Sequence, residues 1–363
     1  EVAAAVASAA RANGSDVEIV RTGSRGLLWL EPLVEVERDG VRYGYGPIDP
    51  SEVVDLVSAG LLTEQRAAHE KAIGPVEEFP YLKKQTRLTF ARCGIIDPAS
   101  LDDYKAHGGY KGLANALSLK PLQIVEQVTK SGLRGRGGAG FPTGIKWKTV
   151  HDSAGDQKYI VCNADEGDSG TFADRMLMEG DPFALIEGMA IAAHAVGAQQ
   201  GYVYVRSEYP HAIAKLSAAI ELAAARIAPF RIELRVGAGA YVCGEETSLL
   251  NSLEGKRGEV RAKPPLPAVA GLFGCPTVVN NGLTLAAVPH ILAEGGAEAY
   301  AALGTGRSRG TTAVQLAGNV RHGGLFEIAF GTTLGELVDD IGGGPGSGPP
   351  GQGGPGRGAG GAP

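Results

Sequence analysis

The sequence predicts an α/β protein built around a parallel β-sheet. Three short apolar stretches, at 159–163, 202–206 and 231–236, alternate with helical patterns at 182–196 and 210–227. An alternation of strand, helix and strand is typical of a parallel, doubly wound sheet with helices packed on it. The chain has 363 residues, of which 44% are hydrophobic and 20% charged, so it is long enough for two or three globular domains.

Charge and hydropathy exclude several classes of protein. The net charge of −6 argues against a general nucleic-acid binder, which would need a broad basic surface. No stretch offers about twenty consecutive apolar residues, so we expect no membrane span. The alanine-rich start lacks the features of a signal peptide. We therefore expect a cytoplasmic enzyme.

The glycine-rich stretch from Ser131 to Lys148 carries the strongest functional signal. Its six glycines allow positive φ and a close approach to a ligand, and four basic residues favour a phosphate. Gly135, Gly137 and Gly140 fit the G-x-G-x-x-G pattern. That pattern requires a preceding strand, whereas Pro121 to Lys130 has the apolar spacing of a helix. We interpret the stretch as a phosphate-binding loop after a helix. The alternative is a flexible basic surface loop.

Acidic residues follow the first predicted strand of the sheet. Asp165, Glu166 and Asp168 come directly after 159–163. Open α/β sheets bind ligands at the carboxyl ends of their strands, so this position indicates a site. The alternative is an acidic, solvated turn.

The third strand leads into Gly237 to Thr247 and a helix predicted at 248–254, whose free N–H groups would attract polar ligand atoms. Two interpretations stay open for Glu245 and Glu246: they bind a ligand, or they only complement the helix dipole. Further on, Asn280 and Asn281 open a helix predicted at 284–293. They offer amides to a ligand or form an ordinary turn.

The N-terminal segment predicts a small α/β unit, with a strand at 17–20, alternation at 32–37 and an amphipathic stretch at 51–62. Residues 22–28 read Thr-Gly-Ser-Arg-Gly-Leu-Leu and precede Glu-Pro-Leu-Val. This resembles the thioredoxin-like [2Fe-2S] domain of NADH-oxidising complexes. Ser24 and Leu28 occupy its cysteine positions and cannot ligate iron as thiolates, so the resemblance implies a unit without a cluster.

The four cysteines form no C-x-x-C pair, and we interpret them as small core residues. Near the C-terminus, a hairpin at 313–319 and 325–330 and a helix at 333–341 predict the start of a ubiquitin-like (β-grasp) module. From Gly342 the composition is mostly glycine and proline, which cannot bury a core.

Four motifs occur in one order on this frame: Arg-Gly-Arg-Gly-Gly-Ala-Gly-Phe-Pro from 134, Cys-Asn-Ala-Asp-Glu from 162, Ala-Tyr-Val-Cys-Gly-Glu-Glu from 240, and Lys-Pro-Pro from 263. They closely resemble the FMN- and NADH-binding 51 kDa-type flavoprotein subunit of respiratory complex I, NAD-dependent formate dehydrogenases and NAD-reducing hydrogenases. The resemblance implies FMN and NAD(H), with hydride transfer between the cofactors and no catalytic side chain. The implied FMN residues are Gly135, Gly137, Lys146, Asn163, Asp165, Glu166, Tyr241, Gly244, Glu245, Asn280, Asn281 and Thr284. The implied NAD residues are Phe141, Asp168, Glu246 and Lys263.

The chain departs from the family pattern at a few positions. Leu266 stands where phenylalanine is common, which weakens the stacking of adenine. The family's C-terminal [4Fe-4S] domain is implied, but its cysteine ligands are absent from these residues. The organisation then expected is a thioredoxin-like domain at 1–65, a connector at 66–115, a Rossmann-like FMN and NAD(H) domain at 116–304, a partial ubiquitin-like module at 311–341 and a tail at 342–363.

The N-terminal extension and Asp168-Ser-Gly favour one relative, the NAD(H)-reacting β subunit of a molybdenum or tungsten formate dehydrogenase. Its expected partners are iron–sulfur subunits, namely a small [2Fe-2S] subunit and a molybdopterin catalytic subunit. Three alternatives stay open: a subunit of complex I or of an NAD-reducing hydrogenase, a flavin-free docking subunit, and a free-standing NADH:acceptor flavoenzyme.

Overall fold

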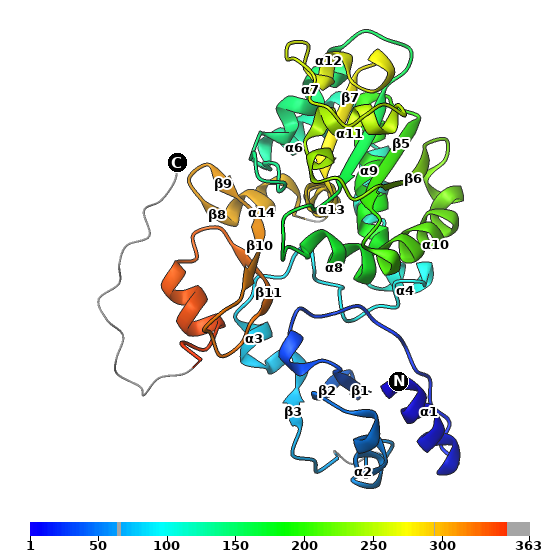
Figure 1. The fold of residues 1–363 in the computed structure, drawn as a ribbon, viewed down its shortest axis with the longest axis vertical. Helices are drawn as coiled ribbons and strands as arrows, with labels where there is room; N and C mark the ends of the chain where they lie inside the picture. Colours follow the sequence, from blue (N-terminus) through cyan, green and yellow to red (C-terminus); the bar gives the residue numbers. More distant parts are fainter. Residues whose placement is uncertain (64–66, 294, 347–363) are drawn as a thin grey trace.

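A four-stranded parallel sheet forms the centre of the fold (Figure 1), as the sequence predicts, in the computed structural model of residues 1–63, 67–293 and 295–346. The strand order is β6-β5-β4-β7, and every neighbouring pair is parallel. The strands are β4 Tyr159–Ala164, β5 Gln200–Arg206, β6 Arg231–Gly237 and β7 Thr277–Asn281. The first three confirm predicted strands, whereas β7 was not predicted. The chain runs outward from β4 to β6 and returns to β7 on the other side of β4. This reversal makes the carboxyl ends of β4 and β7 the topological switch point, where open α/β sheets bind ligands.

Helices cover both faces of the sheet. Because side chains alternate along a strand, Ile160 and Cys162 of β4 face one core, with α9, α10 and α13, while Val161 faces a second core with α11. The helices are α9 Pro182–Val196, α10 Pro210–Ile227, α11 Glu246–Leu253 and α13 Gly282–Leu292. The predicted cap of α9 is confirmed, since the Asp181 carboxylate accepts a hydrogen bond from Ala184 N.

The helices α9 and α13 pack closely through a glycine. A Cβ added at Gly188 would lie 2.0 Å from the carbonyl oxygen of Leu285. Only glycine therefore permits this approach of the two backbones.

Shorter helices complete the domain around the sheet. They are α4 Leu101–Ala106, α5 Lys111–Leu117, α6 Pro121–Lys130, α7 Thr143–Asp152, α8 Ala173–Gly180, α12 Pro267–Ala270 and α14 Gly296–Ala302. The prediction of a helix over 121–130 is confirmed, and so is the short helix near Tyr104. The glycine-rich stretch thus connects two helices, α6 and α7.

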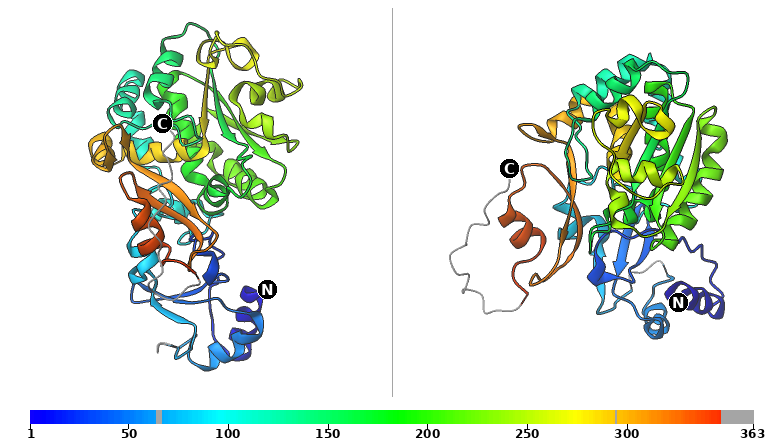
Figure 2. Two further views of the ribbon diagram at one scale, coloured as in Figure 1. Left: turned by 60° about the vertical axis from the view of Figure 1, so that its left-hand side comes forward. Right: turned by 45° about the horizontal axis from the view of Figure 1, so that its top comes forward.

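The N-terminal segment forms a separate small unit at the far end of the molecule (Figures 1 and 2). Its three strands are antiparallel in the order β1-β2-β3. The elements are α1 Val2–Ala12, β1 Val34–Arg38, β2 Val41–Tyr45, α2 Val53–Ser58, β3 Ala72–Pro75 and α3 Pro80–Lys83. The predicted strand at 17–20 is wrong: this stretch is irregular, since no described strand pairs with it, and Val17, Ile19 and Val20 are exposed. The thioredoxin-like assignment is not confirmed by this arrangement.

A C-terminal hairpin lies between this unit and the sheet domain (Figure 2). Its strands are β10 Thr311–Leu316 and β11 Gly324–Ala329, preceded by the two-residue strands β8 Gly304–Thr305 and β9 Ser308–Arg309. The hairpin is confirmed, but a π-helix at Glu336–Ile341 replaces the helix predicted over 333–341. The ubiquitin-like assignment is not confirmed. The predicted tail beyond residue 346 lies outside the described residues.

The buried Glu327 of β11 joins the hairpin to the preceding connector. Its carboxylate accepts hydrogen bonds from the backbone N–H groups of Leu88, Thr89 and Phe90 and from the hydroxyl of Thr311. Among the described helices, none is long and apolar enough to cross a membrane.

Candidate nucleotide-binding site

The glycine loop, defined as residues 131–142, has a fixed base. Arg134 and Pro142 pair across it in an antiparallel bridge, and Gly135 N donates to Phe141 O at 2.9 Å. Arg136 N donates to the Thr284 hydroxyl at 2.8 Å. The loop is thereby attached to α13, whose first residue follows β7 directly.

The tip of the loop lies beside the switch point of the sheet and has free backbone N–H groups. Within the described part of the chain, no atom accepts a hydrogen bond from the four consecutive N–H groups of residues 137–140. Gly138 has φ +105° and Gly140 has φ +59°, and a Cβ on Gly137 would lie 3.0 Å from Asn281 Cβ. Successive free N–H groups in such a turn form a concave anion site.

A network of lysines and glutamates lies beside the loop. Lys146 Nζ on α7 donates to Val279 O at 2.7 Å and lies 3.4 Å from the Glu246 carboxylate. Lys263 Nζ lies 3.0 Å from both Glu245 and Glu246. Burial tends to lower the pKa of Lys263, but its bonds to these two carboxylates raise it overall. Burial tends to raise the pKa of Glu245, but the hydrogen bonds that its carboxylate accepts lower the pKa overall. The same carboxylate caps α11.

The carboxyl end of β4 contributes polar groups to the same edge. The Asn163 amide donates to Gly244 O at 2.8 Å, which joins β4 to the segment before α11. Asp165 is 2% exposed, and burial raises its pKa to about 6, although Arg206 opposes the shift. A carboxyl group with such a pKa exchanges its proton near neutral pH.

Exposed rings and apolar side chains surround these polar groups. Phe141 is 50% exposed, Tyr241 69% and Leu266 52%. The Tyr241 hydroxyl donates to Asp168 at 2.9 Å, and this hydrogen bond raises the tyrosine's pKa. Large apolar side chains left in solvent beside convergent polar groups are typical of a ligand site.

Several predicted residues use their side chains to hold the framework. The Glu166 carboxylate accepts from the N–H groups of Asp174 and Arg175 at the start of α8, and its burial raises its pKa. The Asn280 side chain accepts from Trp147 Nε1 at 2.9 Å, and Asn281 caps α13. The structure brings these residues to the sheet edge but turns their side chains toward protein partners.

Asp174 is a site component that the sequence analysis missed. This buried carboxylate lies 2.6 Å from the Asn281 amide and accepts from Leu283 N at 3.2 Å, so it joins α8 to the start of α13. Burial raises its pKa well above the ordinary value. In the sequence it looks like an ordinary first-turn acid, and only the fold brings it to the switch point.

The structure is thus an α/β domain of the nucleotide-binding type, with a glycine-rich loop at the switch point of a parallel sheet. Residues 128–290 match the family model of the Nuo51 FMN-binding domain. The chain belongs to the 51 kDa-type flavoprotein family, as its motifs predict.

Relatives and solved structures agree with this assignment. The chain is 51% identical over 272 residues to the NADP-reducing hydrogenase subunit HndC of Solidesulfovibrio fructosivorans, covering 72% of this chain and 55% of the relative. It is 51% identical over 262 residues to an NADH-quinone oxidoreductase subunit of Rhizobium meliloti, covering 69% of this chain and 62% of the relative. The chain thus spans less than two thirds of the length of these relatives. It also superposes on an NAD⁺-reducing [NiFe]-hydrogenase in the air-oxidized state with a TM-score of 0.59 and 32% identity, over 94% of this chain and 58% of that chain.

The residues present fit FMN. Four free N–H groups match a phosphate, exposed apolar side chains match a flat ring system, and amides and carboxylates at the strand ends match polar ring and hydroxyl groups. Family membership supports FMN and NAD(H) as the cofactors. Within the described residues, no group of three or more His, Cys, Asp or Glu side chains could hold a metal ion.

Proposed function

We propose that this chain binds FMN and NAD(H) as the flavoprotein subunit of a multi-subunit oxidoreductase. The observation that carries the proposal is the row of four free N–H groups at 137–140, placed at the switch point of the sheet. When bound, FMN supplies hydride exchange with NAD(H) and single-electron transfer to iron–sulfur centres.

The chain's residues position the cofactor and tune its surroundings. The N–H groups of the glycine loop hold the phosphate, and Lys146 adds positive charge beside them. Asn163, Tyr241 and the segment around Gly244 lie at the carboxyl end of the sheet and bind the flavin, and the buried Asp165 lies beside them as a support. The other FMN residues act through the framework: Gly135 and Gly137 shape the loop, and Glu166, Glu245, Asn280, Asn281 and Thr284 fix its supports.

NAD(H) binds on the exposed side of the same edge in this proposal. Phe141 offers a ring for stacking, and Lys263 and Glu246 form a polar rim that binds hydroxyl and phosphate groups. Replacing Glu246 or Asp168 should therefore change the affinity for NAD(H) more than the FMN content. A loss of FMN at unchanged NADH affinity would reverse that assignment.

The electron donor distinguishes the candidate complexes. The relatives include an NADP-reducing hydrogenase subunit and an NADH-quinone oxidoreductase subunit, which supports iron–sulfur partner subunits and favours hydrogen or NADH as donor. The likeness to an NAD⁺-reducing hydrogenase extends over 94% of the chain and so includes the N-terminal unit. Formate as donor, with a [2Fe-2S] and a molybdopterin subunit, stays a prediction from the sequence, as does the cytoplasmic location.

Flavin titration tests the proposal. The purified chain should quench FMN fluorescence with saturation at one equivalent, and anaerobic NADH should then bleach the flavin absorption. Gly138→Ala should weaken FMN binding at least tenfold, because Gly138 lies in the loop tip at φ +105°. Gly274→Ala is the matched control, since Gly274 has φ +76° and equally open space but lies outside the loop.

Equal FMN affinity in both glycine variants would show that the tip of the glycine loop does not bind FMN. A chain that cannot be reconstituted with FMN would refute the enzyme and favour the flavin-free docking subunit. FMN binding without bleaching by NADH would refute the NAD(H) assignment alone.

A further inference from the structure

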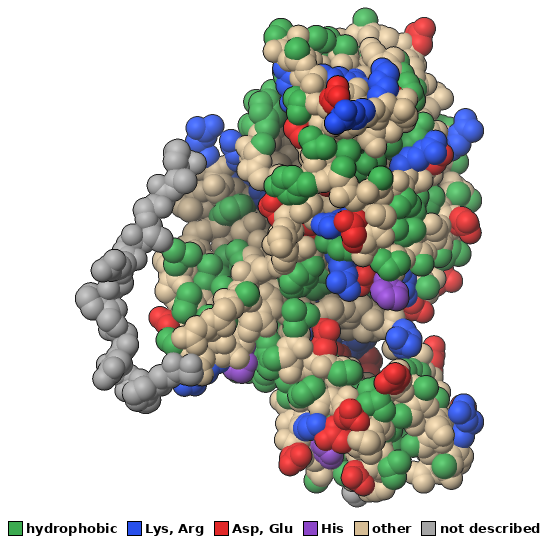
Figure 3. All heavy atoms as spheres, in the orientation of Figure 1, with side chains coloured by type: hydrophobic (Ala, Val, Ile, Leu, Met, Phe, Trp, Pro, Cys, Tyr) green, Lys and Arg blue, Asp and Glu red, His purple; other side chains and the backbone are tan. Residues whose placement is uncertain are grey.

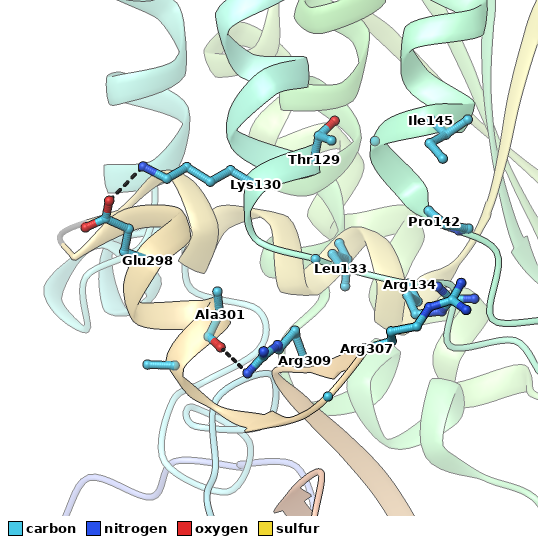
Figure 4. Close-up of a pocket in the computed structure, with 14 residues that line it drawn as sticks. Thr129, Lys130, Leu133, Arg134, Pro142, Ile145, Glu298, Ala301, Arg307 and Arg309 are labelled. Atoms are coloured by element: carbon cyan, nitrogen blue, oxygen red, sulfur yellow. Dashed lines mark hydrogen bonds and ion pairs between the residues drawn. The ribbon is translucent and has the colours of Figure 1, made fainter.

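A basic cavity lies on the outer side of the glycine loop, distinct from the row of free N–H groups. It has a volume of about 560 Å³ and lies between α6, the glycine loop, the start of α7, α14 and the β8–β9 turn (Figure 4). Cavities of 300–1,000 Å³ are typical of small-molecule sites. None of the residues predicted for FMN or NAD lines it.

The lining carries an excess of positive charge. Four basic residues and one acidic residue line the cavity, a difference of three positive charges. The single acid, Glu298, is engaged by Lys130 at 2.7 Å. In the space-filling view, Lys and Arg side chains gather beside the β8–β9 turn (Figure 3). The three arginines are therefore not neutralised by the acid of this cavity.

Two of these arginines are available to a ligand. Among the described residues, none forms a hydrogen bond or ion pair with the guanidinium groups of Arg134 and Arg307. Their side chains extend toward the same edge of the cavity (Figure 4). Arg309 is held against Gly132 and donates to Ala301 O at 3.2 Å. Guanidinium groups bind phosphate oxygens through paired hydrogen bonds, which makes a phosphate the fitting anion.

The backbone holds these arginines in place without filling the cavity. Arg134 pairs with Pro142 in the bridge at the base of the loop, and its carbonyl accepts from Arg136 Nη1 at 2.9 Å. Arg307 lies in the turn that closes the β8–β9 pair. Ordering costs little entropy when the backbone of a binding group is already fixed.

Apart from Thr129, the remaining wall is apolar. Leu133, Pro142, Ile145 and Ala301 line the cavity, and Ile145 is 51% exposed. We propose that this cavity binds a small organic phosphate, with the phosphate on Arg134 and Arg307 and an apolar part against Ile145 and Pro142. An inorganic anion would use only the arginine side, so the apolar wall predicts a preference for a phosphate ester.

Calorimetric titration with phenyl phosphate tests the proposal, with inorganic phosphate as the comparison. Phenyl phosphate should bind with one site and more tightly than inorganic phosphate. The double variant Arg134→Gln with Arg307→Gln should bind phenyl phosphate at least tenfold more weakly. If the double variant folds poorly, Arg307→Gln alone replaces it in the test, because Arg307 lies in an exposed turn. Arg11→Gln with Arg235→Gln changes the net charge equally, far from the cavity, and should have no effect.

The Gly138→Ala variant separates this site from the flavin site. Phenyl phosphate binding should persist in it and in the FMN-loaded chain, because the cavity lies outside the loop tip. Binding lost in Gly138→Ala but kept in the arginine variants would move the phosphate to the flavin cradle and overturn the proposal. Failure of phenyl phosphate to bind, or arginine-dependent binding of an acidic peptide instead, would also overturn it. Absence of FMN binding would not affect these outcomes.

Discussion

Replacement of Arg136 by methionine should loosen the glycine loop. The guanidinium of Arg136 donates four hydrogen bonds, to Thr311 O at 3.0 Å, Arg134 O at 2.9 Å, Tyr300 Oη at 3.0 Å and Arg309 O at 2.7 Å. It also stacks on the ring of Phe330, 4.8 Å from the centroid. These contacts join the glycine loop, α14 and the C-terminal hairpin through one side chain.

The size of the expected loss in unfolding free energy follows from the hydrogen-bonding groups that the substitution leaves unpaired. A hydrogen bond to a charged group contributes about 1.5–3 kcal/mol, but the four bonds share one cation and methionine retains part of the packing. We expect Arg136→Met to lower the free energy of unfolding by about 3–5 kcal/mol. Arg136→Lys keeps the charge but loses the planar fork, so it should recover about half of this loss.

Denaturation in guanidinium chloride and FMN titration measure the effect. The dissociation constant of FMN should rise at least tenfold in Arg136→Met, since about 1.4 kcal/mol of loop ordering corresponds to that factor. Arg134→Met is the control in the same loop, because no described residue binds its guanidinium, and it should cost less than about 0.5 kcal/mol. Equal stability and FMN affinity in the two methionine variants would refute the role of Arg136.

Three further predictions follow from burial and packing. Burial raises the pKa of Asp165 from 3.8 to about 6, so the folded chain retains a proton that the unfolded chain releases. The resulting contribution to stability is present below about pH 4 and is lost as the pH rises through about 6. Asp165→Asn should therefore flatten the fall in the free energy of unfolding between about pH 4 and 7. Gly188→Ala should lower the free energy of unfolding by about 3 kcal/mol or more, because its Cβ would lie 2.0 Å from Leu285 O. Gly197→Ala, at φ +79° in open space at the end of the same helix, should cost only about 1 kcal/mol. Equal losses in denaturation would contradict the packing argument. Cys275, the one cysteine that is not buried, should react first with a thiol reagent, and the other three only on unfolding; a faster buried thiol would contradict the packing.

The parts of the fold that were predicted correctly depend on local patterns. The helix α9 begins at Asp181-Pro182, a cap and first-turn pair that needs no tertiary contact, and α10 has the predicted bounds Pro210–Ile227. β7 was missed because its apolar run, Thr277 to Val279, is short and ends in Asn280-Asn281, which also suits a turn. The predicted strand at 17–20 failed for the opposite reason: its alternation is local, but a strand needs a partner.

The residues of the candidate site show the same division between local sequence patterns and contacts between distant residues. The glycines and the acids after β4 are visible as motifs, because loops that bind phosphate and strand ends that bind polar groups use particular residue types. Asp174 and Trp147 were not predicted, since their roles depend on contacts with Asn281 and Asn280, more than a hundred residues away. Sequence spacing contains no information about such contacts.

The geometry of the glycine loop favours the proposed phosphate-binding loop over a flexible surface loop. A flexible surface loop would expose its N–H groups evenly, yet here Gly135 N and Arg136 N are bonded and the four free N–H groups are consecutive. The Arg136 side chain holds the loop to the hairpin from behind. Because the anchors lie on both sides of the tip, the free N–H groups are already held beside the switch point, and ligand binding costs little loop entropy. This arrangement supports the proposal that the loop binds the flavin phosphate, and the outer side of the loop, where Arg134 borders the basic cavity, is held by the same anchors.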